Sequence, residues 1–488
     1  MSKFVKIWLF FSFLFGLVIF NTSKALAIYD PLTVPNNSFG IHIANIQDLE
    51  DAAKLVNSEE SDWGYVTLVI TEDNRVISLW QEVFNKMRRL HLIPIVRVAT
   101  KEENGSWKKP VIGEIDSWVS FFNSLNWVIK NRYITIGNEV NLGKEWGNEV
   151  NPEAYATYVK EFTDKLKNTN PDFFVMPAGF DASLPTSKVS LDESTYLIRM
   201  IRKEPDVFEL VDGWASHSYP NPNFSGSEYA QGRGTIRTFE WEISFLKSLG
   251  VKKDLPVFIT ETGWSQKNIK EEVISKKLKF AFENVWNDKN VVAITPFILN
   301  YEYPPFDMFS WKNNGSFNSL YNSIQERSAI YCGDELNADM SSSFRGKPRS
   351  LERGGCHENM QKIVKVSGKP IQEDKAEISR IFVPAINLLG TNFTGLFFVE
   401  NKGQTIWLKD NLKVVDENEN NLEIVKISLS SYEPGGSGFI VFKGKSPTTE
   451  GNYQKSIQLV NGKDKISDSN AFLTQPSLCG ILKGSGKP

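Results

Sequence analysis

The chain has 488 residues, which is more than one ordinary domain and predicts two or three. Hydrophobic residues make up 41% of it and charged residues 23%, a composition that excludes a disordered or fibrous chain. The 55 Lys and Arg residues are balanced by 58 Asp and Glu residues, and the formal net charge of -3 argues against a nucleic-acid partner.

The first 27 residues have the three-part pattern of a secretory signal peptide. Lys3 and Lys6 form a positive start, residues 7–20 are apolar, and an A-x-A cleavage pattern ends at Ala27. The apolar run is shorter than the roughly 20 residues that a membrane span needs. We therefore expect a secreted or extracytoplasmic protein that begins near Ile28, with an uncleaved N-terminal anchor as the alternative.

Strand-like and amphipathic segments then alternate eight times between Ser38 and Arg327. The expected strands are 39–44, 65–70, 93–99, 133–140, 173–180, 211–218, 256–262 and 291–299. Apolar residues recur at helical spacing in 46–57, 76–91, 116–125, 152–168, 191–201, 235–249 and 271–286. This rhythm predicts an α/β fold of the (β/α)8 TIM-barrel type. A doubly wound open sheet is the alternative, although no G-x-G-x-x-G motif follows the first strand.

Polar side chains end several expected strands, where barrel enzymes carry their active sites. Glu139 ends the fourth strand, His217 the sixth and Glu261 the seventh. Two carboxylates in apolar strands are costly to bury, so their meeting at one mouth indicates function. Such a pair can hydrolyse glycosides, one carboxyl group protonating the leaving oxygen and the other attacking the sugar. The alternatives are two separate rim salt bridges and a His217 that is merely packed.

These motifs resemble those of the clan A retaining glycoside hydrolases, a group of (β/α)8 glycosidases that includes cellulases, mannanases, β-xylosidases and β-1,3-glucanases. The resemblance covers about residues 38–327 and leaves the exact family open. It implies that Glu139 is the general acid/base and Glu261 the nucleophile. It also implies that Asn138 binds the sugar 2-hydroxyl, that Tyr219 orients Glu261, and that His217 lines the same subsite.

Two positions depart from the clan pattern. The second expected strand ends without the usual arginine, and the nearest is Arg97 on the third strand. Arg97 either takes over that charge role or pairs with a structural acid. The eighth strand has no tryptophan and offers Phe297, Tyr301 and Tyr303 instead.

Loop aromatics and loop acids supply further candidates. Four tryptophans in or beside expected βα loops are either sugar-stacking platforms or loop anchors: Trp63, Trp107, Trp146 and Trp264. Of these, Trp146 and Trp264 are the preferred substrate-binding candidates. Four acids are expected to face solvent, with contacts to substrate hydroxyls as the alternative: Glu145, Glu149, Glu302 and Asp307.

The alternation of strand-like and amphipathic segments ends past Arg327. Strand-like segments at 362–366, 378–383, 395–399, 404–408, 423–429, 438–443 and 453–460 predict an immunoglobulin-like β-sandwich. The expected organisation is a signal peptide at 1–27, a catalytic domain at 28–330, a linker at 331–361, a sandwich at 362–468 and a tail at 469–488. The sandwich either binds carbohydrate or a cell surface, or serves as a passive spacer or as a module that stabilises the barrel.

The three cysteines lack metal-ligand spacing with the four histidines, which argues against a structural zinc site. Export favours a disulfide between Cys332 and Cys356, with Cys479 left over.

The sequence as a whole predicts an exported retaining glycoside hydrolase. Its partner is expected to be a β-linked oligo- or polysaccharide, and neither a metal nor an organic cofactor is expected. The sugar, endo or exo action, attachment to a cell surface or envelope, and oligomeric state stay open. The competing class is a non-catalytic carbohydrate-binding or cell-surface protein on a degenerate barrel, which would not need both Glu139 and Glu261.

Overall fold

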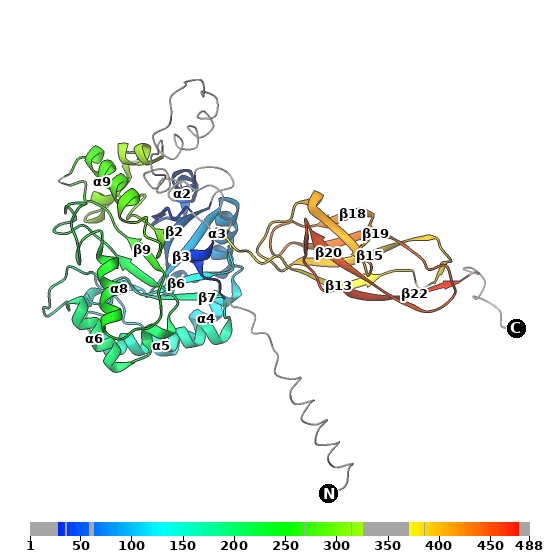
Figure 1. Cartoon of the computed structure of the whole chain (residues 1–488), viewed down its shortest axis with the longest axis horizontal. Coiled ribbons are helices and arrows are strands. Elements are labelled where there is room, and N and C mark those ends of the chain that lie inside the picture. The colour runs from blue at the N-terminus through cyan, green and yellow to red at the C-terminus, as the bar shows by residue number, and fades with distance from the viewer. Residues whose placement is uncertain are drawn as a thin grey trace, which may run out of the picture.

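The computed structural model describes residues 28–34, 37–57, 63–267, 269–313, 315–325, 370–384 and 386–477. The expected signal peptide, the linker, the first sandwich strand and all three cysteines lie outside the described residues. A search of the described helices found none with the length and apolar character needed to span a membrane. An α/β part and a part made of antiparallel strands follow one another along the chain (Figure 1).

Eight parallel strands form the core of the described α/β part. Five make one sheet in the order β1 (Gly40–His42), β2 (Gly64–Thr71), β3 (Leu92–Ala99), β6 (Arg132–Ile136) and β7 (Phe173–Pro177). Three make a second sheet, namely β8 (Trp214–His217), β9 (Val257–Glu261) and β10 (Val291–Ile294). Isolated parallel bridges join Phe39 to Ile294 and Asp181 to His217, so both pairs of sheet edges are in contact. All eight predicted strands are confirmed in position.

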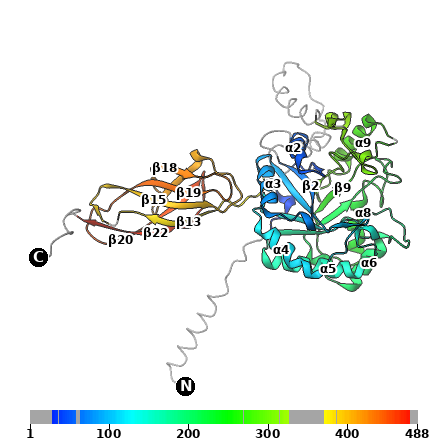
Figure 2. The ribbon, with the colours of Figure 1, turned by 180° about the vertical axis from the view of Figure 1, so that it is seen from behind.

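The strands are buried because helices cover their outer side. The helices are α2 (Leu49–Val56), α3 (Ile77–Arg89), α4 (Ile115–Ser124), α5 (Pro152–Thr169), α6 (Glu193–Lys203), α7 (Val207–Leu210), α8 (Thr238–Ser248) and α9 (Glu271–Asn284). They lie around the strands in two opposite views (Figures 1 and 2). Helix α5 shows why such a helix starts where it does. The Asn151 side chain accepts a hydrogen bond from the Ala154 amide, and Pro152 occupies the first turn, where no amide is needed.

One short helix and two short hairpins were not predicted from the sequence. Helix α7 is one, and the hairpins β4 (Glu102–Glu103) with β5 (Ser106–Trp107) and β11 (Lys312–Asn313) with β12 (Ser316–Phe317) are others. The β4–β5 turn is made by Asn104 and Gly105, both with positive φ. Asn-Gly is the preferred pair for such a two-residue turn. The hairpin carries Trp107 to the edge where the parallel strands end.

The antiparallel part contains two sheets. One has the order β13 (Ala376–Phe382), β15 (Asn392–Asn401), β19 (Ser437–Lys445) and β18 (Ile424–Leu429). The other joins β14 (Ile386–Leu388), β22 (Asn470–Ser477), β20 (Tyr453–Asn461), β16 (Leu412–Asp416), β17 (Asn421–Leu422) and β21 (Asp464–Lys465). Phe397, Phe442 and Leu459 are fully buried in the core of this part.

Two expectations for this part are wrong. The expected strand at 404–408 is a loop, in which Trp407 is buried and donates its indole N–H to Asp374. The expected boundary at 468 falls short, because β22 pairs with β20 beyond it. The polar sequence at 468–470 suggested a disordered tail, but it is only the turn that enters the last described strand.

The antiparallel part contacts the α/β part next to the start of β6. Gln404 Nε2 donates to the Ile129 carbonyl and Gln372 Nε2 to that of Val128, each at 2.7 Å. Asn126 Nδ2 donates to the Gly403 carbonyl at 2.7 Å. Since these residues precede β6, the contact lies at the amino ends of the parallel strands.

Candidate active site

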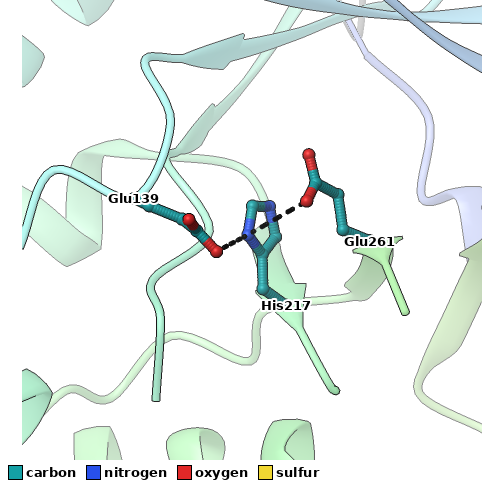
Figure 3. Close-up of side chains that lie close together, drawn as sticks. All are labelled: Glu139, His217 and Glu261. Carbon is teal, nitrogen blue, oxygen red and sulfur yellow. Dashed lines mark hydrogen bonds and ion pairs between the residues drawn. The ribbon is translucent and has the colours of Figure 1, made fainter. Parts of the chain in front are cut away.

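Three ionisable side chains meet at the carboxyl ends of the parallel strands. Glu139 follows β6, His217 is the last residue of β8 and Glu261 the last of β9. Their nearest ligand-type atoms all lie within 4.8 Å of one another. Figure 3 shows the His217 ring between the two carboxylates. Its Nδ1 is 3.0 Å from Glu139 Oε1 and 3.7 Å from Glu261 Oε2.

The backbone around Glu139 leaves the strand conformation sharply. Gly137 has a φ of +86° and Glu139 a φ of +35°, so β6 ends at Ile136 rather than at the predicted Val140. A positive φ is unfavourable for a residue with a Cβ and is concentrated at functional sites. The amide of Glu139 donates to the Gly179 carbonyl, which holds this turn in place.

Glu261 is surrounded by hydrogen-bond donors. Arg97 Nη1 lies 2.5 Å from Oε1, and the Tyr219 hydroxyl donates to Oε2 at 3.1 Å. Burial acts to raise the pKa of Glu261, but His217 and Arg97 outweigh it and hold this pKa below its usual value. Arg97 and Tyr219 therefore both contact this carboxylate.

A fourth group, His42 at the end of β1, was not predicted. Its Nε2 lies 3.8 Å from Glu261 Oε1. Burial and the nearby Arg97 lower the pKa of His42 to about 3. His42 is therefore neutral at pH 7, and Arg97 rather than His42 supplies positive charge to Glu261. The sequence feature that could have identified His42 is its position near the end of the first expected strand, where barrel enzymes place active-site residues.

Glu139 has the opposite electrostatic environment. Burial raises its pKa, the nearby Glu261 raises it further, and His217 opposes the shift. The surroundings thus raise the pKa of one carboxyl group of the pair and lower the pKa of the other. Environments that separate two carboxyl pKa values in this way assign an acid and a base.

The backbone of Gly179 packs closely against the His217 ring. A Cβ added to Gly179 would lie 2.2 Å from His217 Cδ2, so only glycine fits there. His217 is 4% exposed, and burial acts to lower its pKa. The two carboxylates outweigh burial and raise this pKa above its usual value.

Asn138 connects the pair to a further acid. Its Oδ1 accepts from Arg97 Nη1 at 2.7 Å, and its Nδ2 donates to Glu145 Oε2 at 3.3 Å. Burial and the nearby Glu139 raise the pKa of Glu145 to about 7. Glu145 was expected to face solvent, but its side chain is only 9% exposed. The loop after β6 folds back over the strand ends and covers it.

The tryptophans are placed differently from expectation. Trp264 is 2% exposed, donates its indole N–H to the Gly226 carbonyl and packs near Trp286. Trp146 is also 2% exposed and packs against Tyr155. Neither presents a free face for stacking on a sugar, which corrects the prediction made for both. Their loops bury them, and a sequence pattern does not reveal the contacts that do so.

The other two tryptophans lie at opposite ends of the strands. Trp63 directly precedes β2 and stacks on His91, so it lies at the amino ends, away from the site. Trp107 is half-buried and, with Trp146, lines a cavity beside Asn138 and Glu145.

The three clustered side chains could in principle also ligate a cation. Two carboxylates and an imidazole are common metal ligands. Here the Arg97 guanidinium already lies against Glu261, and its charge opposes a second cation at that carboxylate.

Comparison with known proteins gives structural likenesses only. No protein-family model matches the sequence, and no curated protein does. A glycoside hydrolase of family 5, subfamily 18, from Streptomyces cattleya in complex with GlcNAc is 12% identical, with 69% of this chain and 89% of that chain covered and a TM-score of 0.44. A family 39 glycoside hydrolase from Bacteroides cellulosilyticus is 12% identical over 89% of this chain and 82% of that chain, with a TM-score of 0.42.

A family 51 α-L-arabinofuranosidase from Bifidobacterium longum is 11% identical over 85% of this chain and 97% of that chain, with a TM-score of 0.41. TM-scores at this level do not place the chain in a family, so its chemistry has to be argued from its own residues. These three solved structures are glycoside hydrolases of three different families.

Proposed function

We propose that this chain is a retaining glycoside hydrolase that cleaves a β-linked oligo- or polysaccharide by double displacement. One observation carries the proposal: Glu139 and Glu261 approach within 4.8 Å from different strand ends, in opposite electrostatic environments. Retaining glycosidases separate their carboxyl groups by about 5 to 5.5 Å, and inverting ones by about 6.5 to 9.5 Å to admit a water molecule. The short separation favours retention.

The proposed first step forms a covalent intermediate. The ionised Glu261 attacks the anomeric carbon, and the bond from that carbon to the leaving oxygen breaks. Glu139 gives its proton to this oxygen. Arg97 and Tyr219 orient the attacking carboxylate, since both donate hydrogen bonds to it.

The proposed second step reverses the roles. Glu139, now ionised, takes a proton from water while the water oxygen bonds to the anomeric carbon and Glu261 departs. His217 Nδ1, 3.0 Å from Glu139, can donate a hydrogen bond to the carboxylate form. Glu139 is then protonated again, and the site returns to its starting state.

The architecture belongs to the same proposal. The two bridges between the parallel sheets support a closed (β/α)8 barrel, with its catalytic residues at the carboxyl ends of the strands. The two antiparallel sheets support an immunoglobulin-like accessory sandwich after the catalytic domain. We also infer export through a signal peptide at residues 1–27, which would bring the enzyme to polysaccharide outside the cytoplasm.

The competing function is carbohydrate binding without catalysis. A binding site has no need of two carboxylates with separated pKa values, or of a tyrosine and an arginine aimed at one of them. A metal-dependent reaction is separated from this proposal by activity in excess chelator, which double displacement by two carboxylates tolerates.

The test is a panel of aryl β-glycosides and polysaccharides, with the anomer of the first product followed by NMR. The proposal predicts a β-product at the earliest time points, no activity for Glu261→Ala, and azide-accelerated turnover of an activated aryl glycoside by Glu139→Ala. Azide accelerates that variant because a small anion needs no general base. An α-product or hydrolysis by Glu261→Ala would refute the mechanism.

A further inference from the structure

A small cavity adjoins the two catalytic candidates. Its volume is about 30 Å³, which has room for a water molecule or a hydroxyl group but not for a second sugar ring. Its walls include Arg97, Thr100, Trp107, Asn138, Glu145 and Trp146. Arg97 and Asn138 also contact the catalytic cluster, so the cavity lies beside the position of the reacting sugar.

The cavity wall contains polar atoms that no protein group satisfies. Trp146 is 2% exposed, and its indole N–H has no hydrogen-bond partner among the described residues. Arg97 Nε is likewise buried without a partner in the described part of the chain. Buried donors normally have partners, so these two residues keep unused hydrogen-bonding capacity beside the cavity.

Glu145 supplies the acceptor in the same wall. Its Oε2 accepts from Asn138 Nδ2 at 3.3 Å, and its Oε1 lies 4.0 Å from Lys144 Nζ. Burial of this carboxyl group raises its pKa to about 7, which shows how little solvation it keeps. A carboxyl group with so little solvation gains from a hydrogen-bond donor offered by a ligand.

We propose that the cavity receives one hydroxyl-bearing substituent of the reacting sugar and that Glu145 accepts a hydrogen bond from it. Glu145 is then a specificity-determining residue, because a sugar without this hydroxyl removes a hydrogen-bond donor from a buried carboxyl group that otherwise accepts only from Asn138 among the described residues. The walls exclude a bulky group at that ring position. The inference rests on the proposed hydrolase function and adds the substrate feature that the site selects.

The experiment pairs enzyme variants with substrate variants. Mono-deoxy analogues of the best-cleaved aryl glycoside are compared by kcat/KM in the wild type, Glu145→Ala and Glu145→Gln. In the wild type, loss of one particular hydroxyl should lower kcat/KM by roughly 10- to 100-fold, as expected for a hydrogen bond to a charged group. In Glu145→Ala the same loss should have little effect, and in Glu145→Gln an intermediate one.

Comparing the wild type with Glu145→Ala removes those effects of deoxygenation that do not involve Glu145. A deoxygenation changes the intrinsic reactivity of the sugar equally for both enzymes, so the ratio of the two losses isolates the contact with Glu145. Glu149→Gln is the matched control, because this acid lies in the same loop but is 53% exposed and paired with Lys109. It should show the wild-type pattern at every ring position.

The outcomes separate the two proposals. If every deoxygenation has the same effect in the wild type and in folded Glu145→Ala, the specificity role is wrong while the hydrolase function stands. If the wild type cleaves neither glycosides nor polysaccharides, the hydrolase function is wrong and this inference falls with it. Thermal melting of each variant verifies folding, and removing a desolvated carboxyl group should leave the melting temperature unchanged or higher.

Discussion

Glu139 and Glu261 carry identical side chains, yet their surroundings act on the proton in opposite directions. Glu261 has a lowered pKa and must be ionised to attack, so its titration sets the acidic limb of the activity profile. Glu139 has a raised pKa and must be protonated to act first, so activity is lost as pH rises through that pKa. The dependence of kcat/KM on pH should therefore be bell-shaped.

Tyr219→Phe tests the acidic limb. The tyrosine donates a hydrogen bond that favours ionised Glu261, so its loss should raise the pKa of that carboxyl group. The acidic limb of kcat/KM should move to higher pH and the alkaline limb should stay in place. The control is Tyr229→Phe, because Tyr229 is 65% exposed. A shift of the alkaline limb alone would contradict the assignment.

Gly179→Ala tests the position of His217. The added methyl group would lie 2.2 Å from the imidazole, so the ring must move away from Glu139. We expect kcat to fall by at least about 10-fold, since a misplaced catalytic group loses more than its contact energy. Gly113→Ala is the control, because its Cβ would meet nothing within 4 Å. Wild-type kcat in folded Gly179→Ala would show that the His217 position is not needed.

Sequence reasoning found Glu139, His217 and Glu261 because each ends an apolar strand. It did not predict the burial of Glu145 or of Trp264, since both depend on how a loop folds. No periodic pattern encodes that contact.

At the level of elements, the parallel strands were predictable because they are buried on both faces and read as apolar runs. The segment at 404–408 was wrongly predicted to be a strand for a related reason. Ile406 and Leu408 alternate with Trp407 as in a strand, but Leu408 is 62% exposed, and no neighbouring strand pairs with the segment. Alternation identifies one buried face and does not reveal whether a partner strand exists.

The β4–β5 hairpin is a second element that can be tested. Gly105 has a φ of +77°, where a β-branched residue is strained, so Gly105→Val should displace the hairpin that carries Trp107. We expect KM to rise several-fold. Gly462→Val is the control, because Gly462 also has a positive φ and lies in the turn between β20 and β21 of the antiparallel part. Equal KM values for the two variants would exclude a role of the hairpin in substrate binding.

At the level of the whole molecule, the antiparallel part contacts the amino ends of the parallel strands, whereas the catalytic candidates lie at their carboxyl ends. Gln404 is 6% exposed, and its Nε2 donates to the Ile129 carbonyl across this contact, while its Oε1 accepts from the Glu373 amide within the antiparallel part. The described contacts between the two parts therefore lie at the opposite ends of the parallel strands from the catalytic candidates.

Gln404→Ala should lower the free energy of unfolding by about 1 to 3 kcal/mol, because it leaves the buried Ile129 carbonyl without this donor and removes a part-buried hydrogen bond to the Glu373 amide. The kcat/KM on a soluble aryl glycoside should not change. Gln454→Ala, at an exposed position of β20, is the control for both measurements. Denaturant unfolding and kinetics on the same preparations provide the comparison. A loss of kcat/KM without a loss of stability would mean that this contact acts on the site.

The most direct test of double displacement is to trap the covalent intermediate. A 2-deoxy-2-fluoro glycoside with a good leaving group slows the second step, so the sugar stays bonded to the nucleophile and can be located by peptide mass spectrometry. We predict a single label on Glu261, no label in Glu261→Ala, and recovery of activity when the labelled enzyme is incubated with an acceptor. A label on Glu139, or no covalent adduct in an enzyme that hydrolyses the parent glycoside, would contradict the account.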